Sequence, residues 1–382
     1  MMIGLVGKTN VGKSSFFKAA TLLDVEIENR KFVTIEPNVG IAYVSFDCVC
    51  KEFGVKCNPR NGKCIEGKRF IPVKLIDVAG LVPGAHTGRG LGNKFLDELR
   101  RADVLIHVVD FSGRTDEEGN PCVGYDPCKD IEFVEEEIDL WFMSILERAF
   151  SRMRNVKKDE LIETISNQLS GLGVEKETVE MVVKEVGLFN KEELARRIRR
   201  IAKPILIAAN KIDLEEAQQN YERIKKMYSE KIIVPTSAEA EIALRMATEK
   251  GFVRYIPGDD FEIVDESKLT EAQKNALRKI KQLIQKYGST GVQQCLDKAV
   301  FDLLKYIVVF PVEDENRLSD SQGNVLPDAF LMPPGSTALD LAYKIHTDIG
   351  ENFVCALDVR TGKKLGRNYE LKNRDVIKIV AK

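Results

Sequence analysis

The sequence predicts an α/β fold in which a mostly parallel sheet carries a phosphate-binding loop, with helical insertions and a smaller α+β domain after it. An apolar segment at 3–6 leads directly into the glycine-rich segment 7–14, which is followed by a helical pattern. Further apolar segments end in polar residues, as buried parallel strands do at the edge of a sheet where sites form. With 382 residues, the chain is too long for one compact core, so more than one domain is expected.

Composition and charge exclude several classes of protein. Hydrophobic residues make up 44% of the chain, which excludes a mainly disordered protein. The formal net charge of −2 argues against an overall electrostatic grip on nucleic acid, and no DNA partner is expected. No apolar run reaches the roughly 18 residues that a membrane-spanning helix needs. The chain also opens without a secretion signal, so we expect a cytoplasmic protein without a membrane segment.

The glycine-rich segment is a P-loop and predicts the P-loop NTPase fold. It reads G-K-T-N-V-G-K-S and fits the pattern G-x-x-x-x-G-K-[ST] between a strand and a helix. Its glycines let successive backbone N–H groups turn toward phosphate oxygens at the positive end of a helix dipole. Lys13 is expected to bridge the β- and γ-phosphates, and Ser14 to ligate Mg²⁺. The residues expected to contact the nucleotide here are Gly7, Asn10, Val11, Gly12, Lys13, Ser14 and Ser15.

A second magnesium element follows the apolar segment 74–76. Asp77 stands at the carboxyl end of this segment and is expected to hold Mg²⁺ through water. The backbone N–H of Gly80, which follows shortly, is expected to sense the γ-phosphate. An Asp after a strand means little alone, but after a P-loop it indicates a magnesium site.

The base-binding elements come after two later apolar segments. Asp213, in the string Asn210-Lys211-Ile212-Asp213, can accept hydrogen bonds from guanine N1–H and the 2-amino group, which adenine lacks. Asn210 is expected to tie this loop to the P-loop, and the stem of Lys211 to cover the base. After the second segment come Ser237 and Ala238, whose N–H can meet guanine O6. GTP is therefore favoured over ATP.

The segments between these sites resemble a known family. Residues 32–40 (FVTIEPNVG) resemble the first switch of the Obg-like GTPases. Residues 77–85 (DVAGLVPGA) and 88–96 (GRGLGNKFL) are similar to the second switch of the YchF branch. The resemblance implies that Thr34 joins Mg²⁺ and the γ-phosphate, and that the partner is the ribosome or RNA. YchF members usually lack the guanine-reading Asp and can prefer ATP, whereas this chain has Asp213.

The C-terminal region is similar to a TGS domain, a small β-grasp module. The resemblance rests on 331–337 (LMPPGST) and 342–347 (AYKIHT), with Ser336-Thr337 placed to cap a helix over 338–347. Helical spacing of apolar residues over 135–150 and 158–188 predicts a helical insertion before the base motif. The predicted domains are a GTP-binding domain (1–129 and 204–250), a helical insertion (130–203), a helical connecting region (251–304) and a TGS domain (305–382).

The hydrolytic side of the site differs from that of Ras-like GTPases. Leu81 occupies the position of their water-orienting Gln, which predicts slow intrinsic turnover that a partner or potassium would raise. Asn10 stands where some potassium-stimulated GTPases place a cation ligand, or it is a structural loop residue. His86, in the second switch, is a candidate acid or base or a solvated loop residue. His107, in an apolar segment, is expected to be a core residue.

Four cysteines, Cys48, Cys50, Cys57 and Cys64, lie on one expected hairpin. Cys48 and Cys50 are two apart in a segment read as extended, so both are expected to face one side. Four thiolates could bind Zn²⁺, although the spacing is not that of a standard zinc ribbon. Unpaired thiols and, in a hyperthermophile, two disulfides are the other interpretations. Elsewhere, a helix at 192–201 carries Arg196, Arg197, Arg199 and Arg200, which form either a local basic face for RNA or a solvated helix face.

Two classes of function fit these residues. One is a GTPase switch, in which segments near Thr34 and Gly80 order around the γ-phosphate and relax after hydrolysis. The other is a nucleotide-stabilised scaffold that docks a partner and has negligible turnover. An ATPase, as in some YchF relatives, is a third and less favoured interpretation.

Overall fold

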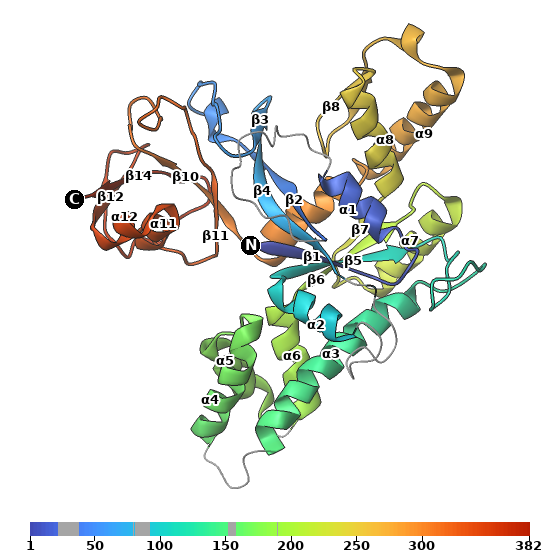
Figure 1. Cartoon of the computed structure of the whole chain (residues 1–382), viewed down its shortest axis with the longest axis horizontal. Helices are drawn as coiled ribbons and strands as arrows, with labels where there is room; N and C mark the ends of the chain where they lie inside the picture. Colours follow the sequence, from blue (N-terminus) through green and yellow to red (C-terminus); the bar gives the residue numbers. More distant parts are fainter. Residues whose placement is uncertain (22–37, 79, 81–91, 152–157, 189) are drawn as a thin grey trace. The chain divides into compact units, whose positions relative to one another are not determined.

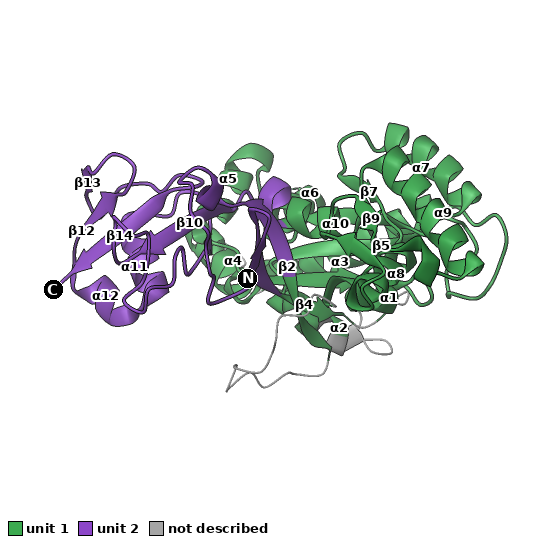
Figure 2. Ribbon diagram, turned by 90° about the horizontal axis from the view of Figure 1, so that it is seen from above, with its two compact units in different colours: residues 1–23, 32–42, 74–299 green, residues 24–31, 43–73, 300–382 purple. Residues whose placement is uncertain are grey.

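The structure is a computed structural model that describes residues 1–21, 38–78, 80, 92–151, 158–188 and 190–382. These residues form two compact units (Figure 2). Unit 2 contains 43–73 and 300–382, and unit 1 contains the rest of the described residues. The sequence places 43–73 inside the GTP-binding domain, whereas in the structure this segment clusters with the C-terminal region.

A seven-stranded sheet has the order β2-β4-β1-β5-β6-β7, with β3 paired to β4. Strand β1 pairs in parallel with β4 and β5, β5 with β6, and β6 with β7. The hairpin strand β3 is antiparallel to β4. The strands of this sheet are β1 (Met2–Val6), β2 (Val39–Asp47), β3 (Lys63–Ile65), β4 (Lys68–Asp77), β5 (Val104–Asp110), β6 (Ile205–Asn210) and β7 (Ile233–Pro235).

The register brings the predicted site segments to one edge of this sheet. Leu5 is paired with Asp77, and Asp110 with Asn210, so parallel strands end beside one another. The carboxyl edge of a parallel sheet is where ligands bind in α/β folds, because the loops that leave the strands gather there. Every residue of β1 and β5 is buried, as expected for strands covered on both faces.

Ten α-helices belong to unit 1 among the described residues. They are α1 (Lys13–Thr21), α2 (Gly92–Arg101), α3 (Cys128–Ser151), α4 (Lys158–Leu169), α5 (Lys176–Val186), α6 (Lys191–Ala202), α7 (Glu215–Met227), α8 (Ala238–Glu249), α9 (Glu271–Tyr287) and α10 (Val292–Lys298). Helices α3 to α6 pack together as one group (Figure 1). They span 128–202, so α3 begins two residues before the range 130–203 predicted as a helical insertion. A 3-10 turn at Ser170–Leu172 separates α4 from α5, so the stretch predicted over 158–188 is two helices.

Two apolar clusters fill unit 1. The first joins β1, β4 and β5 to helices α2 to α6 and includes Trp141 and Phe142. The second joins β5, β6 and β7 to α7, α8 and α9, and it extends to the small hairpin of β8 (Val253–Tyr255) and β9 (Phe261–Ile263). None of the described helices combines the length and apolar content needed to cross a bilayer.

The C-terminal part of unit 2 is a five-stranded sheet in the order β11-β10-β14-β12-β13. Its elements are β10 (Ile307–Val312), β11 (Phe330–Met332), α11 (Ala338–Ile345), α12 (Thr347–Glu351), β12 (Phe353–Asp358), β13 (Lys364–Leu365) and β14 (Val376–Ala381). Thr337 caps α11 in a capping box with Asp340. Leu341 of α11 and Ile377 of β14 lie in the cluster that covers the sheet. The predicted fold class, a mainly parallel α/β domain with a C-terminal α+β domain, is confirmed.

Candidate nucleotide-binding site

Loops at the carboxyl edge of the main sheet surround a cavity of about 590 Å³ in unit 1. Its predicted lining residues are Asn10, Gly12, Lys13, Ser14, Ser15, Gly80, Asn210, Lys211, Asp213, Ser237 and Ala238. Phosphate-loop and base-loop residues thus border one space. Thr34, Leu81 and His86 lie outside the described residues.

Two residues predicted to contact the nucleotide lie behind the cavity. Val11 is buried, with 1% of its surface exposed, and it contributes a backbone carbonyl to the loop. Gly7 sits against β5, where a Cβ atom would approach the Val108 carbonyl oxygen to 2.5 Å. Neither residue lines the cavity, and both support the P-loop by contacts with neighbouring segments. A nucleotide contact from either remains a prediction.

Gly12 is required by a close approach of another loop. Its φ angle is 93°, and a Cβ atom there would lie 2.3 Å from the Asn210 side-chain nitrogen. That nitrogen donates a 2.8 Å hydrogen bond to the Val11 carbonyl oxygen. Any side chain at position 12 would therefore separate the base loop from the P-loop.

The base end of the cavity is built around Asp213. Its carboxylate accepts a 2.7 Å hydrogen bond from the Ser237 hydroxyl, which in turn accepts from the Ala240 N–H at the start of α8. This arrangement holds the carboxylate and leaves acceptor capacity for a ligand. The Ala238 N–H, predicted to meet guanine O6, donates instead to the Asn210 side-chain oxygen at 3.2 Å.

Lys13 is paired with the predicted magnesium residue. Its ammonium donates to the Asp77 carboxylate and, at 2.8 Å, to the Val78 carbonyl oxygen. Ser14, also predicted to bind Mg²⁺, is exposed in the cavity wall. A hydroxyl and a carboxylate are hard oxygen donors, and these fit Mg²⁺. When Mg²⁺ is bound, it would neutralise charge on the phosphates, with Ser14 and Asp77 as its protein-side partners.

A buried carboxylate, that of Asp110, forms an ion pair with Lys211. Asp110, at the end of β5, is 1% exposed and accepts from Lys211 at 2.8 Å and from the Thr115 hydroxyl at 3.0 Å. Burial opposes ionisation here, but the hydrogen bonds from Lys211 and Ser112 prevail and lower the pKa of Asp110. Lys211 also donates to the Asn10 carbonyl oxygen at 3.2 Å, so its ammonium is fixed and its stem is left to contact a base.

The loop 111–127 forms hydrogen bonds with the P-loop that the sequence did not predict. The Thr9 hydroxyl donates to the Glu118 carbonyl oxygen at 2.9 Å, and the Asn10 side-chain nitrogen donates to the Gly119 carbonyl oxygen at 3.0 Å. Lys8 is 4% exposed and donates to Asp130 at 2.9 Å. No motif marks these partners, which are more than a hundred residues away in the chain. The cavity-lining residues absent from the prediction are Lys8, Thr9, Leu214 and Glu239.

Three family profiles match parts of the chain. They are the 50S ribosome-binding GTPase over residues 2–139, the Obg-like GTPase YGR210-like, G4 motif-containing domain over 208–314, and the TGS domain over 322–381. The second profile covers Asn210 and Asp213, in the strand-loop segment that borders the base end of the cavity. The sequence-based assignment to this class of GTPase is therefore confirmed.

Similar proteins agree with this assignment. The chain is 53% identical to an uncharacterized GTP-binding protein of Methanocaldococcus jannaschii, over 100% of this chain and 99% of that one. It is 32% identical to the ribosome-binding ATPase YchF of Bacillus subtilis, over 65% and 68% of the two chains. A crystal structure of a GTP-binding protein from Pyrococcus horikoshii is 40% identical and covers 100% of both chains, with a TM-score of 0.78. The chain belongs to the Obg-like GTPase family, in its YchF-related branch, and is a GTP-binding protein with a C-terminal TGS domain.

Proposed function

We propose that this chain hydrolyses GTP to GDP and phosphate with Mg²⁺, slowly on its own, and that its nucleotide state switches a contact with the ribosome or RNA. The observation that carries the proposal is the placement of Asp213 in the same cavity as Lys13 and Ser14. One end of this space offers a carboxylate to a base, and the other offers a cation and a hydroxyl to phosphates.

Guanine suits the base end better than adenine does. Guanine N1–H and its 2-amino group are two donors for the Asp213 carboxylate, which Ser237 already orients. Adenine presents no donor on that edge and would leave the carboxylate without a partner, so its binding costs free energy. Relatives named ribosome-binding ATPase raise ATP as the competing substrate. Asp213 is the feature of this chain that favours GTP.

Hydrolysis requires positioning and charge stabilisation, since a water attacks the γ-phosphorus and the bond to the β–γ bridging oxygen breaks. Lys13 would leave Asp77 for the β- and γ-phosphates, because a nucleotide brings more negative charge than one carboxylate. The Gly80 N–H would contact the γ-phosphate, and Thr34 would join it with Mg²⁺. Leu81 supplies no hydrogen bond to the attacking water, which is the reason to propose slow intrinsic turnover.

Potassium is a second charge source for the same step. In this structure the Asn10 side-chain nitrogen bonds to Gly119, which leaves its amide oxygen available as a cation ligand. A K⁺ ion there would offset charge that develops between the β- and γ-phosphates. Turnover should then be faster in potassium than in sodium salts at equal ionic strength. Equal rates would remove potassium from the proposal and leave Asn10 as a residue that holds the 111–127 loop.

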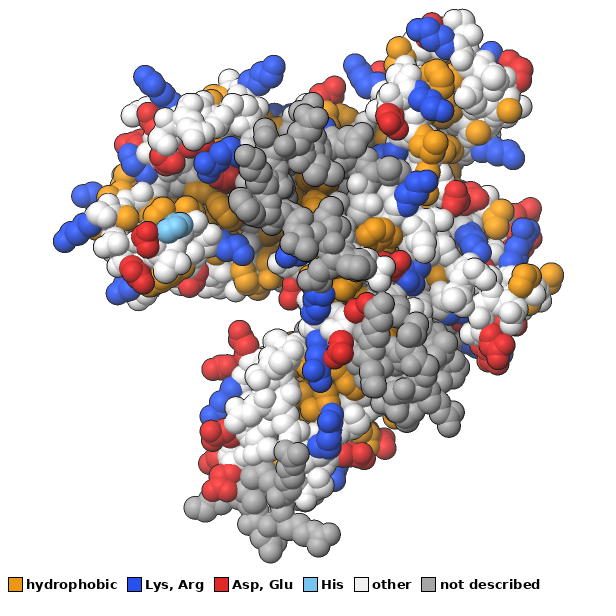
Figure 3. Space-filling view, viewed as in Figure 1, with side chains coloured by type: hydrophobic (Ala, Val, Ile, Leu, Met, Phe, Trp, Pro, Cys, Tyr) orange, Lys and Arg blue, Asp and Glu red, His pale blue; other side chains and the backbone are white. Residues whose placement is uncertain are grey.

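The ribosome enters the proposal through the relatives. Several are named ribosome-binding ATPase, and the profile matching 2–139 is described as a 50S ribosome-binding GTPase. On the face drawn in Figure 3, basic and acidic side chains lie intermixed over the described surface. Arg199 of α6 is not part of an RNA-binding face, because it is 3% exposed and paired with Asp139 at 2.5 Å.

Nucleotide competition tests base choice directly. The protein is first stripped of nucleotide and loaded with a fluorescent GDP analogue. GTP should displace this analogue at far lower concentrations than ATP does. Equal or stronger competition by ATP would favour the ATPase interpretation.

Multiple-turnover phosphate release, measured with and without ribosomes and with RNA alone, tests the switch. No stimulation, together with stably bound GTP, would favour a nucleotide-stabilised scaffold instead.

A further inference from the structure

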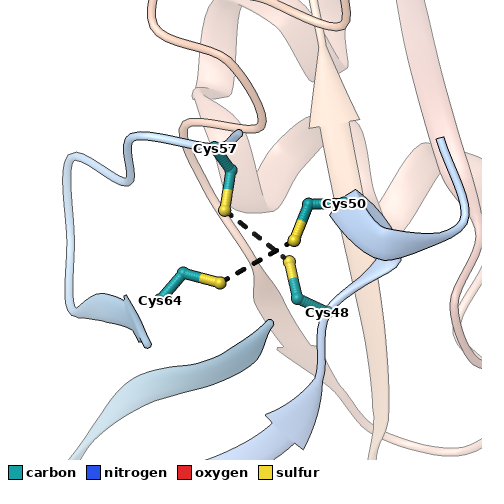
Figure 4. Close-up of side chains that lie close together, drawn as sticks. All are labelled: Cys48, Cys50, Cys57 and Cys64. Atoms are coloured by element: carbon teal, nitrogen blue, oxygen red, sulfur yellow. Dashed lines mark hydrogen bonds between the residues drawn. The ribbon is translucent and has the colours of Figure 1, made fainter. Parts of the chain in front are cut away.

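We infer that Cys48, Cys50, Cys57 and Cys64 form a structural zinc site in unit 2. The four Sγ atoms all lie within 4.8 Å of one another. Figure 4 shows the four side chains pointing toward a common centre. The site lies outside the nucleotide cavity and does not depend on GTP hydrolysis.

The distances suit a tetrahedral tetrathiolate. Cys48 and Cys57 have their sulfur atoms 3.9 Å apart, and so do Cys50 and Cys64. A Zn–S bond of about 2.3 Å places the sulfur atoms of a regular tetrahedron about 3.8 Å apart. Because all the other sulfur–sulfur distances also stay below 4.8 Å, the four thiols form one cluster rather than two separate pairs. Four protein ligands leave no open position, which is typical of a structural zinc site.

Local structure places these ligands in a way that the sequence pattern did not predict. The segment read as extended is a 3-10 turn, Val49–Lys51, that begins directly after Cys48. Cys48 is tied by its N–H to the Gly67 carbonyl oxygen at 2.9 Å, which brings it to the hairpin of β3 and β4. Cys64 lies in β3 of that hairpin, and Cys57 precedes the loop that enters it. Cys48 and Cys50 are buried, so the centre is shielded on their side.

A buried arginine gives an independent reason for negative charge at this place. Arg69 is 0% exposed and is among the largest fully buried side chains. Its guanidinium lies 3.8 Å from the Cys57 sulfur and donates to the Leu326 carbonyl oxygen at 2.8 Å. Within the part of the chain that the structure describes, this sulfur and this carbonyl are its hydrogen-bond partners, and its buried Nε has none. A buried cation is costly without a counter-charge, and four thiolates around Zn²⁺ carry a net charge of −2.

The loop between Cys57 and Cys64 is the part that such a site would shape. Within unit 2, Asn58 donates from its backbone to the Val325 carbonyl oxygen at 3.1 Å, and Arg60 donates to that of Pro327 at 2.9 Å. The Arg60 guanidinium also pairs with Asp328. One zinc ion bound by Cys57 and Cys64 would fix both ends of this loop. The loop would then be ordered for these contacts with the C-terminal segment.

Zinc binding requires the four thiols to lose their protons to solvent, with no change of oxidation state. Full-length protein, purified under reducing conditions without chelator, should contain stoichiometric zinc by elemental analysis. Cys57→Ser and Cys64→Ser should lose most of it. Cys355→Ser, which removes a half-buried thiol of β12 in the same unit, should keep it.

A second measurement avoids dependence on variants that fail to fold. Wild-type protein stripped of metal and titrated with Co²⁺ should show the absorption of a tetrahedral thiolate centre, which Zn²⁺ then displaces. Stoichiometric iron in the purified protein would overturn zinc as the metal. Two disulfides by intact mass, or four free thiols that give no Co²⁺ spectrum, would overturn the site itself.

Discussion

The Asn210 side chain bonds to the Val11 carbonyl oxygen at 2.8 Å and to the Ala238 N–H at 3.2 Å, so one amide joins the P-loop, the base loop and the start of α8. Removing it would leave a buried carbonyl and a buried N–H without partners. Each such loss costs about 1–3 kcal/mol. The geometry of all three elements around a nucleotide therefore depends on this residue.

Asn210→Ala should weaken GDP and GTP binding by about 10-fold or more, because both loops lose their shared anchor. Isothermal titration with each nucleotide would measure the change. Asn220→Ala is the matched control, since it removes a similar 2.9 Å amide–carbonyl bond, to Phe111, away from the cavity. Equal affinity losses in the two variants would show that Asn210 acts only through general stability.

Gly12→Ala should abolish measurable nucleotide binding while the helical content stays near that of the wild type. The added methyl group would meet the Asn210 nitrogen at 2.3 Å, and the φ of 93° is strained for alanine. Nucleotide titration and circular dichroism would separate the two effects. Gly171→Ala, where a Cβ meets nothing within 4 Å, should leave binding unchanged.

Asp213→Asn should change the preferred base. The amide puts an NH2 donor in place of one carboxylate oxygen, so it can no longer accept from both guanine N1–H and the 2-amino group. GTP affinity should therefore fall by about 100-fold or more. Xanthine carries a carbonyl in place of the 2-amino group, so xanthosine triphosphate should bind the variant better than the wild type. Competition against labelled GDP and labelled XDP would measure both. Glu239→Gln, at another carboxylate of the same cavity, which accepts from Ser15 at 2.8 Å, should retain guanine preference.

His107 should make unit 1 less stable in mild acid. Burial lowers the pKa of His107 to about 3, against about 6.5 in an unfolded chain. Between these values the unfolded state binds a proton that the folded state does not, so stability falls as the pH drops below 6.5. At pH 5 the loss from this residue is about 2 kcal/mol relative to pH 7.5.

The urea midpoint followed by fluorescence of Trp141 measures this effect, because Trp141 is the single tryptophan and is buried in unit 1. His107→Gln should reduce the shift of the midpoint between pH 7.5 and pH 5. A shift as large as that of the wild type would show that carboxylates, and not His107, cause the acid sensitivity.

Local signals predicted much of the fold and the ligand-facing part of the site. Apolar strands ending in Asp77 and Asn210, and the cap at Thr337, could be read directly because each depends on neighbouring residues. The Lys8–Asp130 pair could not, since no pattern in the sequence links the two positions. Arg199 shows a different limit. It lies one helical turn after buried Ala195, so its periodicity places it in the core, although its charge suggested a surface residue.

Among the described residues, unit 2 is assembled from two stretches of chain, 43–73 and 300–382, which are separated by residues 74–299. A ribosome that makes this protein therefore completes unit 1 before it makes the strands that the cysteine hairpin will contact. Until then Arg69 has no Leu326 carbonyl to bond, and Asn58 and Arg60 have no partners at 325–328. The cysteine hairpin is therefore synthesised long before the C-terminal segment that contacts it. A chain truncated near residue 300 would leave these hairpin residues without their partners permanently. Such a truncation is therefore a poor way to isolate the nucleotide-binding half of this protein.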